Sequence, residues 1–414
     1  MVREIVNIQI GQCGNKIGIQ FWDMITRECH LMPTGSYCGS HDRSFDEIRV
    51  YFTETKEEKF IPRSVLVDFN KYEINQGQIM NLFKQENFFY DHSNFNSNWS
   101  SCFYASGSEI SEPIADIIRR EVELCDSPQG FQLIHSLGGF TGSCRGSSIL
   151  SHLQDEYPDL IRSTFSVLPS QKVTDTEIDT YNCILSLSQL MLTCDQVFYF
   201  DNKDLFDFAY KDLRLSTPTY GDLNYIVACD MVGATCSLRN HCCLNSDLRK
   251  ISINHIPFDR LKFLKATFAP ATSRGSTRCY AYKVHDLTSI LFGNNEEVLL
   301  GASVNFCGRF TSSDAVIEHM EEVNSKSGRD VDIKTSICHV CIENHWRSAA
   351  SIKNSTDCIK KLRKQIYDFR SLFEKRACLH LFRSQGIDDP DFEIAEMDII
   401  DLIQDYESYN LDNE

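Results

Sequence analysis

Apolar residues in the first part of the chain form short runs that lead through glycine-rich turns into helical patterns. Residues 5–10 form one such run, and the turn Gly11–Asn15 follows it. Beyond this turn, Ile17, Phe21 and Ile25 recur at the spacing of one helix face. A short apolar run indicates a buried strand, and the four-residue spacing indicates an amphipathic helix. The pattern therefore predicts a strand, a glycine turn and a helix as the first unit of the chain.

A second unit of the same kind surrounds the segment Ser136–Gly146. Phe131–Ile134 predicts a buried strand before it, and Ser148–Tyr157 predicts a helix after it. Its glycines let the backbone approach a ligand, and Thr141, Ser143 and the free N–H groups of a helix start can bind phosphate. A tight turn without any ligand explains the pattern equally well. No lysine follows the last glycine and the spacing is not G-x-G-x-x-G, so two familiar nucleotide motifs are excluded.

The remaining patterns divide the chain into two kinds of structure. At 414 residues it exceeds one ordinary core, so two or more domains are expected. Strands alternate with helices up to about residue 202, which favours a largely parallel sheet covered on both faces. Beyond it, a helix with few charges and then an α+β segment are expected. The further predicted strands are 64–67, 163–167, 197–200, 302–310, 334–340 and 349–353. One further helix is predicted to begin near Ser111. The other predicted helices cover residues 220–238, 313–323, 356–382 (broken near Ser371) and 391–409.

Charge and cysteine content limit the possible partners. The net charge is −17, and eleven acids with no lysine or arginine follow Arg383. Nucleic acid is an unsuitable partner for such a surface, whereas a basic protein would be attracted to it. A solvated acidic face is the alternative explanation. We expect the eighteen cysteines to be reduced thiols of a cytosolic protein, because no signal peptide or membrane-spanning run is present.

Taken together, these residues resemble the tubulin family over nearly the whole chain. The matching segments are Gly11–Asn15, Gly138–Ser143, Thr217–Asn224, Leu244–Lys250 and Thr272–Ser276. The resemblance implies an α/β fold with a parallel-sheet, Rossmann-like GTPase domain, a core helix, an α+β intermediate domain and C-terminal helices. The expected domains are residues 1–202 for nucleotide binding, 203–367 for the core helix and intermediate domain, and 368–414 for the acidic helical region.

The resemblance also implies a site for GTP or GDP. By residue type, carboxylates suit a sugar hydroxyl, asparagines suit the edge of a purine, and a tyrosine ring can stack on it. In the family, the glycine-rich loop holds the phosphates. The expected nucleotide-binding residues are Gln12, Cys13, Ser136, Gly139, Phe140, Thr141, Gly142, Asp175, Asp179, Asn202, Tyr220 and Asn224.

Three positions separate this chain from a typical member of the family. α-Type tubulins have a glutamate at the position of Lys250, where it orients the water that attacks the neighbour's GTP. A lysine cannot act as that base, so the chain resembles the β type and no catalytic residue is assigned. Asn70 replaces a glutamate at the Mg²⁺ site, so metal binding is expected to be weakened. Phe140 replaces a loop glycine, and a phenylalanine with positive φ would be strained.

The functional hypothesis is a cytoplasmic, cytoskeletal subunit of microtubules. It would bind GTP, pair with an α-type tubulin and contact longitudinal and lateral tubulin neighbours, with hydrolysis completed in trans by the next subunit. Its acidic C-terminal helix would bind microtubule-associated proteins or motors, and neither nucleic acid nor membrane insertion is expected. One alternative is a specialised tubulin that binds nucleotide without efficient hydrolysis or assembly. A dinucleotide-dependent enzyme is a weaker one, since no acidic residue follows the fingerprint spacing.

Overall fold

The computed structural model describes most of the chain. The described residues are 3–39, 45–69, 78–90, 99, 103, 111–170, 176–240, 244–274, 282–293, 297–308, 313–327, 331–338, 340 and 346–411. The strands are β1 (Glu4–Ile10), β2 (Phe52–Glu54), β3 (Phe60–Pro62), β4 (Ser64–Asp68), β5 (Phe88–Tyr90), β6 (Pro128–Ser136), β7 (Ile161–Leu168), β8 (Gln196–Asp201), β9 (Phe263–Ala269), β10 (Leu299–Gly308), β11 (Lys334–Cys338) and β12 (Arg347–Ser355).

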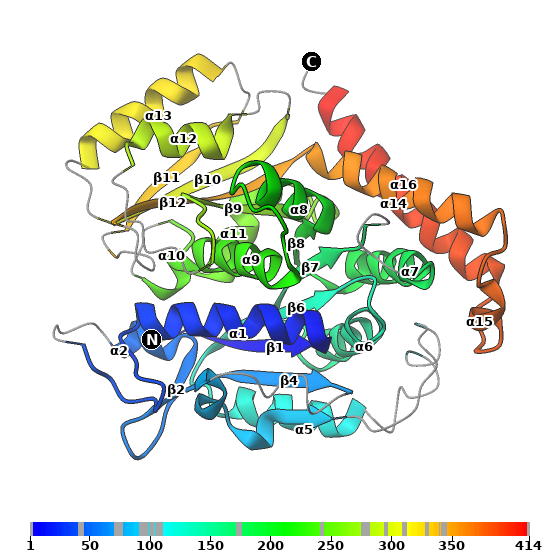
Figure 1. The fold of residues 1–414 in the computed structure, drawn as a ribbon, viewed down its shortest axis with the longest axis horizontal. Helices are drawn as coiled ribbons and strands as arrows, with labels where there is room; N and C mark the ends of the chain where they lie inside the picture. Colours follow the sequence, from blue (N-terminus) through cyan, green and yellow to red (C-terminus); the bar gives the residue numbers. More distant parts are fainter. Residues whose placement is uncertain are drawn as a thin grey trace.

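Helices connect and cover these strands (Figure 1). They are α1 (Gly11–Glu28), α2 (Phe45–Arg49), α5 (Ser111–Glu123), α6 (Phe140–Glu156), α7 (Ile178–Thr193), α8 (Asn202–Lys211), α9 (Tyr220–Ala234), α10 (Cys236–Arg239), α11 (Leu248–His255), α12 (Val284–Phe292), α13 (Ser313–Ser327), α14 (Asp357–Phe373), α15 (Leu379–Arg383) and α16 (Asp389–Leu411), with short 3₁₀ turns at Gln78–Leu82 and Gln85–Asn87. None of the helices in the described part is long and apolar enough to span a membrane.

Ten of the described strands form one sheet, in the order β11-β10-β12-β9-β8-β7-β6-β1-β4-β5. The pairs from β5 to β9 are all parallel. At β12 the direction changes, because β12 runs antiparallel to both β9 and β10. Every residue of β1 and β8 is buried, as expected for strands covered on both faces. The α/β fold predicted from the sequence is therefore confirmed.

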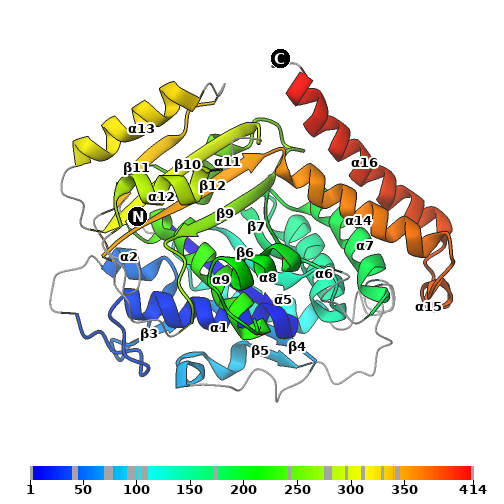
Figure 2. The ribbon, with the colours of Figure 1, turned by 45° about the horizontal axis from the view of Figure 1, so that its top comes forward.

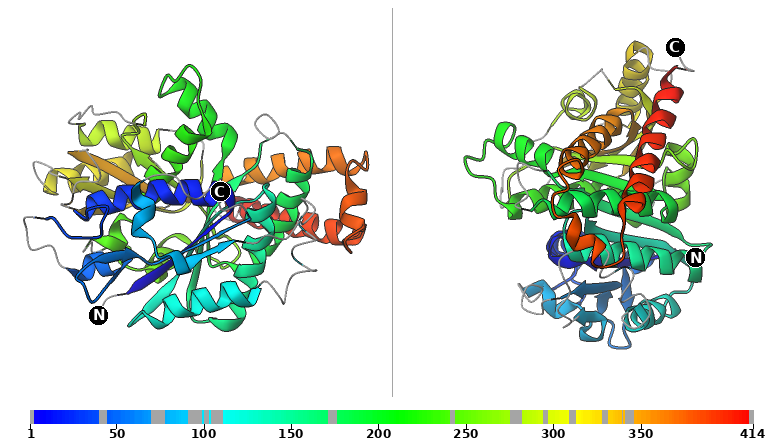
Figure 3. Two further views of the ribbon diagram at one scale, coloured as in Figure 1. Left: turned by 60° about the horizontal axis from the view of Figure 1, so that its bottom comes forward. Right: turned by 90° about the vertical axis from the view of Figure 1, so that its right-hand side faces the viewer.

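Two hydrophobic cores lie on opposite faces of the parallel part of the sheet. One core joins α1, α9 and α11 to the sheet through residues such as Trp22, Val227 and Leu248. The other joins α5, α6, α7, α14 and α16 through residues such as Leu150 and Leu402. Figures 2 and 3 show α14 and α16 lying side by side along the outside of the molecule, beyond α7. A third core lies under α12 and α13.

Several predicted element boundaries differ from the structure. The helix predicted at residues 148–157 begins at Phe140, inside the glycine-rich segment, because its small residues allow the helix to start directly after the strand. The helix predicted at 220–238 is two helices, α9 and α10, which meet at Thr235. Thr235 Oγ1 donates to the carbonyl of Met231 at 2.6 Å, a local bond that competes with continuing the helix.

The thiol state agrees with the expectation at most positions. Twelve cysteines of the described residues are free. Cys144 is disulfide-bonded, so the expectation of reduced thiols throughout is wrong at that residue. The predicted domain boundaries stay predictions, since the sheet passes without interruption from β8 to β9.

Candidate functional site

A cavity of about 350 Å³ opens where the parallel strands β1, β6, β7 and β8 end. This volume lies within the range of small-molecule sites. Its wall combines residues from the turn after β6 with side chains from α1, α7, α8 and α9. The lining residues are Gln12, Cys13, Lys16, Ser136, Gly138, Gly139, Val167, Pro169, Asp179, Asn202, Tyr220 and Asn224. Doubly wound sheets bind ligands at this edge, because loops from several strands converge there.

Two helix starts meet at one end of this cavity. Helix α1 begins at Gly11, immediately after β1, and α6 begins at Phe140, shortly after β6. Gly11 has φ +71°, a conformation that most other residues resist. A Cβ at Gly142 would lie 2.6 Å from the Ser136 carbonyl oxygen, so only glycine lets α6 pack this close to β6. Free N–H groups at two such helix starts form an environment suited to phosphate.

Asparagine and tyrosine side chains line the other end. Asn202 is the first residue of α8, while Tyr220 and Asn224 lie one turn apart on α9. The Thr219 N–H and hydroxyl donate to the Asp222 carboxylate at 2.9 and 2.6 Å, which fixes the start of α9. These bonds also lower the pKa of Asp222. This end therefore offers amide donors and acceptors beside an aromatic ring, as a purine base requires.

Contacts from neighbouring helices hold the cavity's loops. The Asn182 side chain of α7 donates to the Gly138 carbonyl at 3.0 Å. Gln365 of α14 donates to the Pro169 carbonyl at 3.0 Å, and Lys364 Nζ lies 3.3 Å from Ser170 Oγ. The C-terminal helix α14 thus supports the loop after β7 from behind. Such supporting contacts keep a binding site close to its required geometry.

Two titratable groups near the phosphate end are uncharged at neutral pH. Burial raises the pKa of the Cys13 thiol to about 12, with a smaller opposing effect from Lys16. Burial also lowers the pKa of His135 to about 4. The His135 ring nitrogens lie 2.8 Å from the Gly142 carbonyl oxygen and 2.9 Å from Ser166 Oγ, so the ring ties α6 to β6 and β7. The Cys13 thiol is therefore not in its nucleophilic thiolate form, and both ring nitrogens of His135 are engaged by Gly142 and Ser166 rather than open to a substrate water.

Phe140 does not have the strained conformation expected from the sequence. It is the first residue of α6, and no positive φ is found in the glycine-rich turn among the described residues. A helix start needs negative φ, which phenylalanine adopts freely. Its ring stacks on Phe69, the residue after β4, with 5.3 Å between the ring centroids and 23° between the planes. The guanidinium of Arg145 lies 5.9 Å from the Phe69 centroid.

Eight of the twelve expected nucleotide-binding residues line this cavity. Phe140, Thr141 and Gly142 lie at the start of α6 beside it, although they are not part of its wall. Asp175 lies outside the described residues. The wall also contains residues that the sequence did not single out, above all Lys16, which is one helical turn beyond Gln12. The spacing from Gln12 to Lys16 was the available signal, since it puts both side chains on one face of α1.

The described residues do not build a metal site here. Asn70, the expected weakened Mg²⁺ position, lies outside them. The nearby Asp68 carboxylate accepts hydrogen bonds from the Asn15 side chain at 3.1 Å and from the Phe69 N–H at 2.8 Å. Among the residues that are described, no cluster of three or more histidine, cysteine, aspartate or glutamate side chains could hold a metal ion. We therefore derive no step through a protein-held cation.

The segment Leu244–Lys250 lies at the opposite edge of the sheet. Asp247 caps α11 by accepting from the Lys250 N–H at 2.8 Å, and it pairs with Arg3 at 2.5 Å. Arg3 immediately precedes β1, so this segment is beside the amino ends of the strands. The Gln129 side chain, near the start of β6, accepts from the Leu248 N–H at 2.9 Å. Lys250 itself is exposed.

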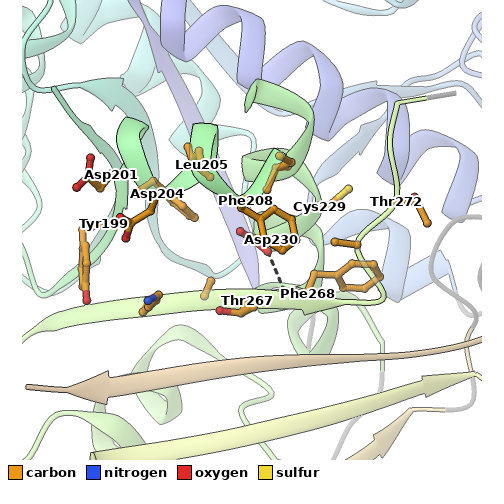
Figure 4. A pocket seen from close by; sticks show the side chains of 15 residues that line it. Tyr199, Asp201, Asp204, Leu205, Phe208, Cys229, Asp230, Thr267, Phe268 and Thr272 are labelled. Carbon is orange, nitrogen blue, oxygen red and sulfur yellow. Dashed lines mark hydrogen bonds between the residues drawn. The ribbon is translucent and has the colours of Figure 1, made fainter. Parts of the chain in front are cut away.

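A second cavity, of about 250 Å³, lies between α8, α9 and β9 (Figure 4). Phe208, Cys229 and Phe268 give it mainly apolar walls. Asp230 accepts a hydrogen bond from the Phe268 N–H at 2.7 Å, and burial raises its pKa to about 8. Thr272, at the start of the tubulin-like segment Thr272–Ser276, also lines this cavity. Residues 275 and 276 of that segment lie outside the described residues.

The parallel sheet and the site at its carboxyl edge define a nucleotide-binding class of α/β protein, and sequence comparisons identify the family. The model of the Tubulin/FtsZ family, GTPase domain, matches residues 4–210. The nucleomorph tubulin beta chain of Guillardia theta is 39% identical over 426 residues, which cover 99% of this chain and 96% of that one. The tubulin beta-5 chain of Ectocarpus variabilis is 38% identical over 425 residues, covering 99% and 95%. The chain belongs to the tubulin family, and it is a divergent member of the β type.

Proposed function

We propose that this chain binds a guanine nucleotide in the cavity at the carboxyl ends of its parallel strands. The convergence of different chemical groups at the two ends of that cavity carries the proposal. Two helix starts and a glycine-rich turn suit phosphates at one end. At the other end, Asn202 and Asn224 suit the edge of guanine, and Tyr220 suits its face. Asp179, between the two ends, suits a ribose hydroxyl.

We further propose that the chain pairs with an α-type tubulin and joins longitudinal and lateral neighbours in microtubules of the cytoskeleton. The positions of two features support this. The cavity lies at the carboxyl edge of the sheet, whereas Leu244–Lys250 lies at its amino edge. A contact between two such different surfaces is head-to-tail, and it can build a filament when successive subunits do not close into a ring. The similarity to tubulin beta chains supports an α-type subunit as the partner.

In this proposal, hydrolysis of a GTP bound to this chain is completed in trans by the next subunit. Among the described residues at the site we assign no base, because the Cys13 thiol stays protonated and both ring nitrogens of His135 are engaged by Gly142 and Ser166. Lys250 stands where α-type chains carry the carboxylate that orients water. Catalysis at this site would thus depend on a neighbour with that carboxylate. Any Mg²⁺ would be held mainly through the phosphates of the ligand.

A second candidate function is a specialised tubulin that holds its nucleotide without efficient turnover. Phe140 favours it, because this residue replaces a glycine of the family's phosphate loop and begins α6, with its ring stacked on Phe69. Both candidate functions share guanine-nucleotide binding and pairing with an α-type subunit.

The acids of α16 are proposed to bind basic partners such as motors or microtubule-associated proteins.

The experiment is to co-express the chain with an α-type tubulin, purify the complex and identify its nucleotides by chromatography. We expect guanine nucleotide in excess of one equivalent per complex, because the α-type subunit binds its own. Asn224→Ala should lower that excess, whereas Gln404→Ala on the exposed face of α16 should not. No stable complex, or only adenine or nicotinamide nucleotides, would refute the proposal. Abundant GDP after assembly would favour turnover over the second candidate.

A further inference from the structure

One face of α14 is turned toward the carboxyl ends of β7 and β8. Lys361, Lys364 and Gln365 lie on this face, because they are three and four residues apart on the helix. Gln365, which is only 2% exposed, donates to the Pro169 carbonyl at 3.0 Å. Lys364 Nζ lies 3.3 Å from Ser170 Oγ. Pro169 lines the cavity, so α14 holds the wall that follows β7.

The last residue of β8, Asp201, connects the same face of α14 to a second wall of the cavity. Its two carboxylate oxygens have separate partners. Oδ1 accepts from the Lys203 N–H at 2.9 Å and so caps α8. Oδ2 lies 3.5 Å from Lys361 Nζ and 3.7 Å from Lys364 Nζ. Asn202, the first residue of α8, lines the cavity directly after this carboxylate.

The ion pairs of Asp201 are largely shielded from water. The Asp201 side chain is 2% exposed, while those of Lys361 and Lys364 are 17% and 30% exposed. Removing the cations beside a carboxylate held this deeply is unfavourable, because water cannot replace them. Lys361 also pairs with Asp204, in the first turn of α8. The start of α8 is therefore held both at its cap and in its first turn.

These contacts act on the end of the cavity that suits a purine. Asn202 belongs to that end together with Tyr220 and Asn224. The turn after β6, at the phosphate end, is held by α7 instead, where Asn182 donates to the Gly138 carbonyl at 3.0 Å. Hydrogen bonds weaken steeply with distance and angle, so recognition of a base edge depends on where an asparagine amide points. Loosening the start of α8 should therefore affect the base more than the phosphates.

We propose that Lys361 and Lys364 are positioning residues that hold Asn202, through Asp201, where it recognises the edge of guanine. The inference rests on the proposed guanine-nucleotide site and specifies which groups outside the cavity set its preference for the base. Neither lysine is among the residues that line the cavity, so both act through the cap of α8. They take no part in chemistry.

The test uses the full chain in complex with an unaltered α-type tubulin. Unlabelled GDP and ADP compete with a fluorescent GDP analogue. The two competitors share ribose and phosphates, so the ratio of their affinities reports on the base alone. We expect the unaltered complex to bind GDP at least about 100-fold more tightly than ADP. Asp201→Asn should lower this ratio at least about fivefold, by weakening GDP, because the amide keeps the cap but loses both ion pairs.

Variants of α14 test the lysines themselves. The combined change Lys361→Met and Lys364→Met should lower the GDP/ADP ratio by a similar factor, whereas arginine at both positions should keep most of it, because the charges remain. Lys360→Met is the matched control, since Lys360 is an exposed lysine of the same helix, and it should leave the ratio unchanged. Thermal unfolding shows which variants fold. If the double methionine variant does not, Asp201→Asn decides alone.

Removing Asn202 itself separates a positioning role from a general structural one. Asn202→Ala should lower the GDP/ADP ratio. Adding Asp201→Asn to that variant should then change the ratio by less than about twofold, because the group that the ion pairs position is gone. A further fivefold loss would show that the ion pairs act through another part of the molecule, and it overturns the inference.

The remaining outcomes separate this inference from the proposal beneath it. A GDP/ADP ratio that Asp201→Asn leaves unchanged overturns the positioning role and leaves guanine-nucleotide binding intact. If GDP and ADP bind the unaltered complex equally, or if neither displaces the analogue, the proposed guanine site fails, and the positioning role fails with it.

Discussion

Asp230 shows how one buried residue couples this fold to pH. Its carboxyl is enclosed by apolar side chains, and burial raises its pKa from 3.8 to about 8. Between these two values the folded chain binds a proton that the unfolded chain has lost. Stability must therefore fall as the pH rises from about 4 to about 8. Below that window this group costs nothing, because it is protonated in both states.

We predict that Asp230→Asn stabilises the protein, and that the gain grows with pH. The amide oxygen can still accept from the Phe268 N–H, while no charge has to be buried. We expect a gain of about 1 kcal/mol or more at pH 8 and almost none at pH 4. Thermal unfolding of the two proteins across this range measures it. Asp212→Asn, at an exposed position after α8, is the control. If the plots of stability against pH run parallel for the wild type and Asp230→Asn, the prediction is contradicted.

The sequence identified much of the candidate site at the level of residues. Glycines and hydroxyls next to apolar runs mark the phosphate end, since strand, turn and helix follow one another locally. Lys16 was not singled out, although its spacing from Gln12 places both side chains on one face of α1. Phe140 was recognised as a departure from the family, but whether its φ would be positive was not decided by the sequence. Its φ is negative because α6 starts at that residue, a boundary that no local pattern fixed.

At the level of elements, the buried strands were predicted well and helix limits less well. Strands β1, β6, β7 and β8 are apolar runs between polar turns, so local pattern and final environment agree. The break between α9 and α10 depends on a tertiary contact in addition to the local bond of Thr235. Arg239 of α10 is only 1% exposed and pairs with Glu28 of α1 at 2.9 Å, which anchors α10 separately from α9. No local sequence pattern indicates that Arg239 and Glu28 form an ion pair.

We predict that Glu28→Ala destabilises the protein strongly, by about 3–5 kcal/mol, because it leaves the buried Arg239 charge without its carboxylate. Asn240, which donates to Glu28 at 3.2 Å, loses its acceptor as well. Denaturant unfolding measures the loss. Asp23→Ala, which breaks the exposed Asp23–Arg27 pair on the same helix, should cost less than about 1 kcal/mol. Similar losses for both variants would show that burial does not set the strength of the inner pair.

At the scale of the whole molecule, α16 combines a structural face with an acidic one. Phe392, Leu402 and Tyr406 are buried, and the Tyr406 hydroxyl lies 3.2 Å from both the Phe263 N–H and the Asn354 side-chain oxygen. Deleting this helix would open the core, so a deletion cannot isolate the contribution of charge. Substitutions at exposed acids can.

We predict that the combined change Asp388→Asn, Glu393→Gln and Asp401→Asn weakens binding of basic partner proteins to assembled polymer. Each of these side chains is exposed, so folding should be unaffected. Loss of three charges reduces long-range attraction, and the effect should shrink at high salt. Co-sedimentation of a basic motor or associated protein at low and high salt measures it. Unchanged binding at low salt would remove α16 as the docking surface.

The opposite edges of the sheet lead to the last prediction, which concerns assembly. Lys250 is exposed at the amino edge, and its Nζ donates to Ser246 Oγ at 2.7 Å. If this edge meets the phosphate end of the α-type partner's site, Lys250 pairs with an anion there. Lys250→Ala should then weaken the complex about tenfold, the effect of losing one charged hydrogen bond. Analytical ultracentrifugation of the dimer measures this dissociation, with Lys211→Ala, at another exposed lysine, as control.

Lys250→Arg should preserve most of the affinity, because it keeps the charge. If Lys250→Ala dissociates no faster than Lys211→Ala, the amino edge does not face the partner's nucleotide, and the head-to-tail arrangement must use another surface.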